Sequence, residues 1–184
     1  MIPENANVLD IGCGGGRTLE TLASLVKFGK AVGIDYSEDS VAVARKRNRK
    51  RIVSGRVEVL HGSVSSMPFS DATFDFVTAV ESYYFWHDIT ADLAEIRRVM
   101  KPNGQLVIIA GMYLGSKFDK RNMKLIRVGG MRCFSVQEFE DNLQGAGFPD
   151  IAVTVEPRKG WICVVSVLGP NHNTKEYANC VYGK

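Results

Sequence analysis

The 184-residue sequence has few cysteines, no long apolar run and little net charge. Its four cysteines lie far apart without C-x-x-C spacing, which argues against a zinc site or a disulfide framework and favours a reducing compartment, the cytoplasm. No apolar run approaches the length that spans a bilayer and no signal-peptide pattern is present, so we expect no membrane span. A net charge of +3 is too small to indicate a nucleic-acid partner.

One short segment departs from this charge balance. Residues 45–51 read Arg-Lys-Arg-Asn-Arg-Lys-Arg and fall at the end of the helix expected after Ser37, where cations interact favourably with the helix dipole. We interpret the run as a solvated helix end rather than an RNA contact. Length and composition otherwise predict one α/β domain over residues 1–168 and a polar tail over residues 169–184.

Glycine is concentrated near the start of the chain. Residues 12–16 read Gly-Cys-Gly-Gly-Gly and join an apolar run, Val8–Ile11, to a segment with apolar residues at helical spacing, Thr18–Val26. Glycines permit positive φ and a close approach of the backbone to a ligand. The pattern therefore predicts a buried strand, a ligand-holding loop and a helix.

Two residues beside this loop bear on its ligand. A dinucleotide-binding fingerprint would place its third glycine at position 17, where the sequence has Arg17. Asp10 would repel a phosphate at the strand end, whereas its carboxylate suits a ligand that carries positive charge or donates hydrogen bonds. A pyrophosphate ligand is therefore disfavoured, and a nicotinamide-dependent oxidoreductase stays as an alternative.

The segment Asp10–Gly16 resembles the first motif, D-x-G-C-G-x-G, of class I S-adenosylmethionine-dependent methyltransferases, especially those of ubiquinone and menaquinone biosynthesis. Residues 98–104, Arg-Val-Met-Lys-Pro-Asn-Gly, resemble a later family junction, and the likeness covers roughly residues 5–168. The resemblance implies a Rossmann-like, doubly wound, seven-stranded sheet that is mostly parallel with an antiparallel C-terminal hairpin. Independently, the strands expected at Ile151–Glu156 and Gly160–Leu168 are joined too closely to be anything but antiparallel.

The resemblance also implies a reaction and a set of cofactor-binding residues. S-adenosylmethionine is the expected cofactor, and its methyl group passes to a small-molecule acceptor by in-line displacement. The expected cofactor-binding residues are Asp10, Gly12, Cys13, Gly14, Gly16, Asp35, Tyr36, Ser63, Val64 and Val80. No metal site is expected. Three other functions stay open: a non-catalytic cofactor-binding subunit, an aminopropyl transferase and the oxidoreductase.

Asp35 has support from spacing as well. It ends an apolar strand roughly 20 residues after the glycine loop, where doubly wound folds place a carboxylate on ribose hydroxyls. The alternative is that Asp35 and Ser37 only cap the next helix. Ser63 stands where the family commonly has an aspartate that receives the adenine amino group, and a neutral hydroxyl is a weaker acceptor.

The expected strand Phe74–Val80 leads to four consecutive aromatic residues, 83–86. Because open α/β sheets bind ligands at strand ends, these rings either wall a pocket for the methionine chain and a planar acceptor or form a core cluster. Glu81 is the candidate catalytic residue, as a general base for an acceptor that keeps its proton. We interpret His87 as a structural or helix-entry residue.

Two further segments complete the expectation. Residues 111–132 carry several basic side chains without a clean period, and the resemblance implies that they shape the acceptor pocket. Ser135–Glu138 is a capping box that predicts a helix start. The family's usual lid helices would precede Val8, so we expect a chain that binds cofactor but needs a cover, and a homo-oligomer or a lid-supplying partner stays open.

Overall fold

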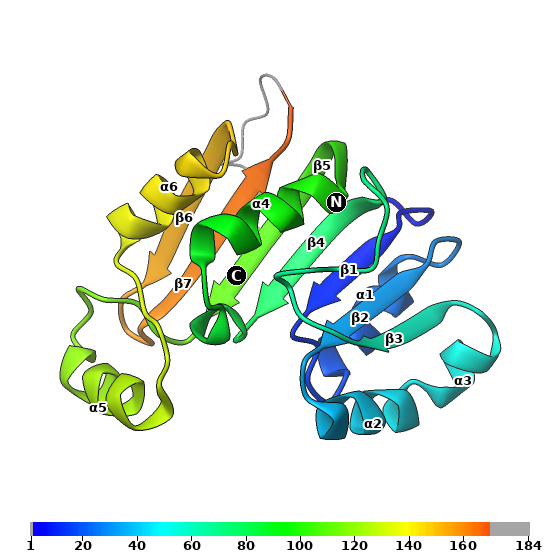
Figure 1. Ribbon diagram of the computed structural model, residues 1–184, viewed down its shortest axis with the longest axis horizontal. Coiled ribbons are helices and arrows are strands. Elements are labelled where there is room, and N and C mark those ends of the chain that lie inside the picture. Colours follow the sequence, from blue (N-terminus) through cyan, green and yellow to red (C-terminus); the bar gives the residue numbers. More distant parts are fainter. Residues whose placement is uncertain (1, 170–184) are drawn as a thin grey trace.

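The computed structural model describes residues 2–169, and a seven-stranded sheet forms its centre (Figure 1). The strands are β1 Val8–Ile11, β2 Ala31–Asp35, β3 Val57–His61, β4 Phe74–Val80, β5 Met100–Ala110, β6 Asp150–Glu156 and β7 Trp161–Val167. The helices are α1 Arg17–Leu25, α2 Glu38–Arg47, α3 Arg49–Val53, α4 Ile89–Val99, α5 Asp119–Gly129 and α6 Val136–Gly145, with a 3₁₀ turn at Tyr83–Phe85.

The strand order is β3-β2-β1-β4-β5-β7-β6. Strands β1 to β5 run parallel to their neighbours, and β7 pairs antiparallel with both β5 and β6. The predicted mostly parallel, doubly wound sheet with an antiparallel C-terminal hairpin is confirmed. Because the parallel strands share one direction, the ends of β1, β2, β3 and β4 meet at one edge of the sheet.

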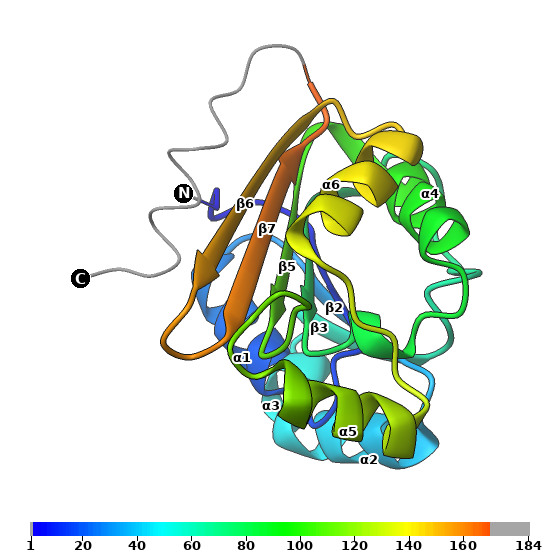
Figure 2. The same ribbon diagram turned by 90° about the vertical axis from the view of Figure 1, so that its left-hand side faces the viewer.

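Helices cover the sheet on both faces (Figure 2). Every residue of β1 and β2 is buried, as expected for parallel strands packed on two sides. The larger core lies on the side of α4 and α6, and a second core lies on the side of α1 and α2. None of the helices within residues 2–169 is both long and apolar enough to cross a bilayer.

Local signals set several helix starts. The Ser37 side chain accepts a hydrogen bond from the Ser40 N–H at 3.2 Å at the start of α2, and Asp88 caps α4. The predicted capping box of Ser135 and Glu138 is present at the start of α6. These boundaries follow from residues within one helical turn.

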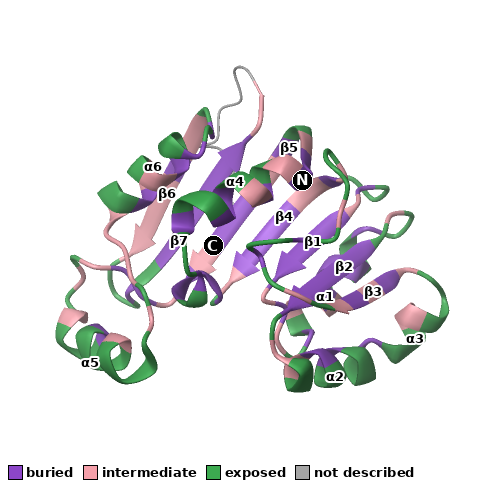
Figure 3. Ribbon diagram, viewed as in Figure 1, coloured by how far each residue is buried: buried purple, intermediate pink, exposed green. Residues whose placement is uncertain are grey.

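Two segments differ from the sequence expectation. Residues 119–129, predicted without periodicity, form α5, whose only buried residue is Asn122 (Figure 3). The apolar residues Met123, Leu125 and Val128 of α5 are exposed, so this helix does not pack an apolar face in the core. The basic run of residues 45–51 spans the break between α2 and α3 at Asn48 rather than one helix end. The predicted tail lies, apart from Gly169, outside the described residues.

Candidate functional site

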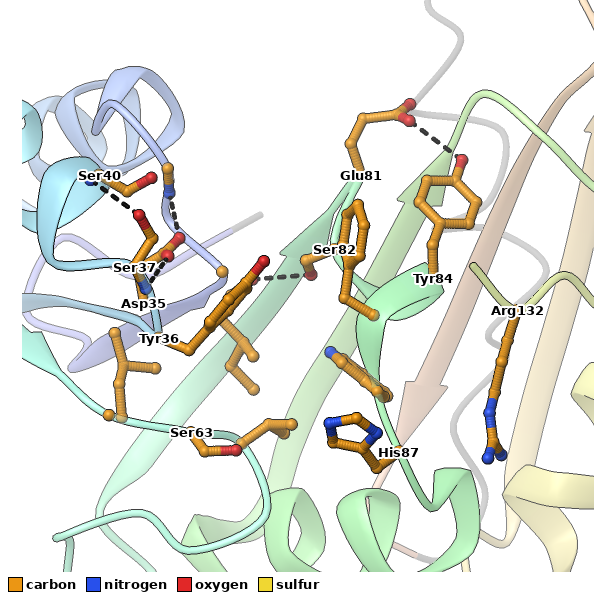
Figure 4. A pocket seen from close by; sticks show the side chains of 18 of the residues that line it. Asp35, Tyr36, Ser37, Ser40, Ser63, Glu81, Ser82, Tyr84, His87 and Arg132 are labelled. Atoms are coloured by element: carbon orange, nitrogen blue, oxygen red, sulfur yellow. Dashed lines mark hydrogen bonds between the residues drawn. The ribbon is translucent and has the colours of Figure 1, made fainter. Parts of the chain in front are cut away.

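A cavity of about 690 Å³ opens at the sheet edge where the parallel strands end (Figure 4). One side, here the glycine-loop wall, comprises Ile11, Gly12, Gly14, residues 34–37, Ser40 and residues 62–64. The other, here the aromatic wall, comprises Glu81, Ser82, residues 84–87, Gly129, Gly130 and Arg132. The two walls are distant in sequence and are brought together because β1 lies beside both β2 and β4.

Gly12 lets the glycine loop cross the segment after β4. Its φ is +66°, and a Cβ on it would lie 2.4 Å from the Ser82 Cβ. The Ser82 Oγ donates a hydrogen bond to the Ile11 carbonyl at 2.9 Å, and the Gly12 N–H donates to the Ile34 carbonyl at 2.8 Å. The loop position therefore requires a residue without a side chain.

Asp35 ties this loop to the start of α2. Its Oδ2 accepts a hydrogen bond from the Gly14 N–H at 2.8 Å, and its Oδ1 accepts one from the Ser37 N–H at 2.9 Å. A carboxylate offers about four lone-pair sites, so roughly two remain for a ligand. Ser37 is the helix cap, and both Asp35 and Ser37 line the cavity.

Asp10 lies behind the loop and does not line the cavity. It is 1% exposed, and its Oδ1 accepts a hydrogen bond from the Thr78 hydroxyl at 2.9 Å. Its Oδ2 is buried with no hydrogen-bond partner among the described residues. Burial raises the pKa of Asp10 to about 7, against the lowering effect of Thr78. The Asp10 carboxyl group therefore changes its charge near neutral pH.

The predicted site residues divide between the cavity and its support. Those that line the cavity are Gly12, Gly14, Asp35, Tyr36, Ser63, Val64 and Glu81. Those that lie outside its lining are Asp10, Cys13, Gly16 and Val80. A Cβ on Gly33 would lie 2.9 Å from the Cys13 Sγ, and burial raises the pKa of Cys13 to about 12, so this thiol is a packing group.

The part of the glycine-loop wall that contains Tyr36, Ser63 and Val64 is more apolar than the part around Asp35. Val64 is buried, and the ring of Tyr36 is 65% exposed beside the cavity (Figure 4). The Ser63 Oγ accepts a hydrogen bond from the Ser65 N–H at 3.2 Å. This end can receive a planar group and offers it a hydroxyl as its polar partner.

The four consecutive aromatics serve both purposes that the sequence left open. Tyr83 packs in the core against Phe139, with ring centroids 4.8 Å apart. Tyr84, Phe85 and Trp86 line the cavity. A pocket wall and a core cluster are therefore built from neighbouring residues.

Glu81 and Tyr84 form a fixed pair on the aromatic wall. The Tyr84 hydroxyl donates to the Glu81 Oε2 at 3.0 Å and accepts a hydrogen bond from the Met112 N–H at 3.1 Å. Burial, with the Glu81 charge beside it, raises the pKa of Tyr84 above its ordinary value. Glu81 has a φ of +56°, a strained conformation for a residue with a side chain, and strain of this kind gathers at functional sites.

The cavity lining also contains Ser82, His87 and Arg132, to which the sequence expectation gave no binding or catalytic role. Ser82 carries no motif, and His87 lines the cavity while its neighbour Asp88 takes the helix-capping position. Arg132 reaches the cavity from residues 111–132, the segment that the resemblance implied would shape the acceptor pocket. No local signal marks Arg132, because its place depends on a hydrogen bond from its N–H to the Tyr84 carbonyl at 2.8 Å.

Comparisons with known proteins agree with this arrangement. Residues 9–108 match the family model described as a methyltransferase domain. The chain is 33% identical to YrhH of Bacillus subtilis over 135 residues, covering 73% of each chain. It is 35% identical to demethylmenaquinone methyltransferase of Bacillus velezensis over 109 residues, 59% of this chain and 46% of that protein. The chain thus spans about half the length of that relative.

A solved structure gives the same result in three dimensions. The S-adenosylmethionine-dependent methyltransferase of Aquifex aeolicus superposes with a TM-score of 0.71 at 25% sequence identity. The match covers 89% of this chain and 82% of that one. The likeness therefore extends beyond residues 9–108 to the C-terminal strands.

Proposed function

This chain belongs to the class I S-adenosylmethionine-dependent methyltransferases, and we propose that it transfers the methyl group of S-adenosylmethionine to a small-molecule acceptor. The observation that carries the proposal is a cavity shared by two walls. One wall is the glycine loop with Asp35, and the other is the aromatic wall with Glu81. The small-molecule acceptor rests on likeness to the demethylmenaquinone enzyme, whose name states such a substrate.

The residues of the cavity fit this cofactor. A volume of 690 Å³ lies within the range of roughly 300–1,000 Å³ typical of small-molecule sites. Asp35 keeps acceptor capacity for ribose hydroxyls after its two N–H contacts. We propose that Gly12, Gly14 and Tyr36, with Ser63 and Val64 at the adenine end, contact the cofactor.

The remaining predicted cofactor residues are assigned to support. Asp10, Cys13 and Gly16 hold the loop from behind: a Cβ on Gly16 would lie 2.9 Å from Ala44. Val80 pairs with Ile109 and carries the strained Glu81 to the cavity. Asp10, whose Oδ2 has no partner among the described residues, adds a negative potential that favours a cationic ligand only when it is deprotonated, at a pH above about 7.

Methyl transfer from S-adenosylmethionine requires little chemical assistance from protein side chains. The cofactor, when bound, supplies a methyl group already activated on a sulfonium, so positioning and exclusion of water do most of the catalytic work. Tyr84, Phe85 and Trp86 would orient a planar acceptor and exclude water. Oε2 of Glu81 accepts a hydrogen bond from the Tyr84 hydroxyl, which leaves Oε1 to take a proton from an acceptor that holds one.

Three wider proposals accompany this one. We propose residues 1–168 as the methyltransferase domain. We propose a cytoplasmic location, because Cys13, Cys133 and Cys163 are free thiols of the kind kept in reducing compartments. The methyl acceptor is the proposed partner, and a homo-oligomer or a lid-supplying protein stays a prediction.

Titration calorimetry tests the cofactor first. We expect heat on addition of S-adenosylmethionine or S-adenosylhomocysteine and none on addition of NADH. Heat with NADH alone would overturn the proposal in favour of an oxidoreductase. Release of S-adenosylhomocysteine across a panel of quinol, phenol and amine acceptors then tests transfer. Tight cofactor binding with no turnover on any acceptor would favour the non-catalytic alternative.

A further inference from the structure

The cavity contains two side chains that cofactor binding and the proposed proton transfer do not use, Arg132 and His87. Both belong to the aromatic wall, across the cavity from Asp35 and Ser37 (Figure 4). Both are solvent-exposed, so an incoming acceptor can reach them. Their place in the cavity, on the side where the acceptor would sit, makes them candidates for recognising it.

Arg132 is held in position by its backbone. Its N–H donates to the Tyr84 carbonyl at 2.8 Å, which joins the segment after α5 to the aromatic loop. The two residues that line the cavity just before it are Gly129 and Gly130, and Gly130 ends α5 with a φ of +61°. These glycines have no side chains, so the guanidinium is the largest polar group that this segment brings to the cavity.

The guanidinium has no ion-pair or hydrogen-bond partner among the residues that the structure describes. By contrast, Arg98 pairs with Glu95 and Asp71. The carboxylates on the cavity are otherwise engaged: Asp35 with two N–H groups and Glu81 with Tyr84. The cavity thus has a cationic group on its acceptor side that no protein carboxylate neutralises.

The segment leading to Arg132 adds to the positive potential. Residues 117–132 contain six basic residues and one acidic residue. The basic residues are Lys117, Lys120, Arg121, Lys124, Arg127 and Arg132. Clustered charge of one sign beside a cleft raises the local concentration of oppositely charged ligands.

We propose that the methyl acceptor carries an anionic oxygen group, a carboxylate or a phosphate, which Arg132 binds with His87 as a second hydrogen-bond donor. The planar fork of a guanidinium matches both groups with two parallel hydrogen bonds. The aromatic residues Tyr84, Phe85 and Trp86 hold the rest of an apolar or planar acceptor. This inference rests on the proposed function and adds the charge class of its substrate.

Matched ligand pairs test the inference without knowledge of the natural acceptor. The probes are benzoate against benzamide and phenyl phosphate against phenol, each titrated at millimolar concentration with saturating S-adenosylhomocysteine. We expect the wild-type protein to prefer at least one anionic member by roughly tenfold. The pair that shows the preference distinguishes a carboxylate from a phosphate.

Two variants locate the preference. Arg132→Gln should abolish it, whereas Arg127→Gln, an exposed arginine of α5 outside the cavity lining, should keep it. Arg132→Lys should keep part of it, because charge remains while the two-pronged geometry is lost. Equal affinity within both pairs, no binding of either anion, or an unchanged preference in Arg132→Gln would overturn the inference. Binding of S-adenosylhomocysteine in the same samples shows whether the proposed function fails separately.

Discussion

The two walls of the cavity are held in different ways. The glycine-loop wall depends on backbone groups: Gly12 and Gly14 donate N–H bonds to β2 and Asp35, and the strands beneath are buried. The aromatic wall depends on side chains such as Tyr84, and on the exposed α5 segment (Figure 3). A wall made of backbone suits a ligand that does not vary, whereas a wall made of side chains can change with the acceptor.

The largest effect should come from adding a side chain at Gly12, where the glycine loop passes close to Ser82. Gly12→Ala places a Cβ 2.4 Å from the Ser82 Cβ at a φ of +66°, so we expect a loss of about 3 kcal/mol in folding free energy and loss of cofactor binding. Denaturant unfolding and calorimetry measure the two.

Gly14→Ala is the matched control. Its φ is +50°, but a Cβ there meets nothing within 4 Å, so the expected cost is about 1 kcal/mol from backbone strain alone. Equal costs for the two variants would mean that the loop does not cross Ser82 closely, and the distinction between the two walls would weaken.

Asp35→Ala should weaken cofactor binding by about 1.5 to 3 kcal/mol, or roughly 10- to 100-fold, because it removes a charged acceptor from the cavity. The change also releases the Gly14 and Ser37 N–H groups. Calorimetry with S-adenosylhomocysteine gives the affinity, and Asp39→Ala, an exposed carboxylate in the first turn of α2, serves as control. Unchanged affinity in a folded Asp35→Ala protein would reduce Asp35 to a helix cap.

Asp10→Asn should flatten the pH dependence of stability. Burial raises the pKa of Asp10 to about 7 in the folded state, so the folded protein holds a proton that the unfolded chain releases near pH 4. This contribution is complete at low pH and is lost as pH rises toward 7. Between pH 5 and 7.5 the wild type should lose about 2 kcal/mol that Asp10→Asn does not lose.

Urea unfolding at the two pH values checks this slope rather than the absolute stability of either protein. A slope that is the same in both proteins would show that Asp10 is ionised throughout. The glycine-loop wall would then contain a permanent buried charge instead of a titrating one.

Tyr84→Phe tests the aromatic wall with the smallest expected change. Loss of its hydroxyl removes hydrogen bonds to Glu81 and Met112, at a cost of about 1 kcal/mol in stability. Turnover on a protonated acceptor should fall while cofactor affinity stays unchanged, because Glu81 is no longer held in place. A parallel loss of cofactor affinity would show that the two walls are not independent.

Much of the fold was readable because its signals are local. The buried runs of β1 and β2, the cap at Ser37 and the capping box at Ser135 each lie within a few residues and set their elements directly. The short link between β6 and β7 predicted their antiparallel pairing. Helix α5 was not predicted, and in the structure its apolar residues Met123, Leu125 and Val128 are exposed rather than packed in the core.

The amino-acid sequence was enough to predict the strand, glycine loop and helix at residues 8–25 and the acid at the end of β2. Long-range packing, which the sequence does not display, places Asp10 and Cys13 behind the cavity and brings Ser82, His87 and Arg132 into its lining. The reason is physical: periodicity and caps act over one or two turns, whereas the aromatic wall assembles from segments about 45 residues apart. These segments meet through the hydrogen bond from the Arg132 N–H to the Tyr84 carbonyl.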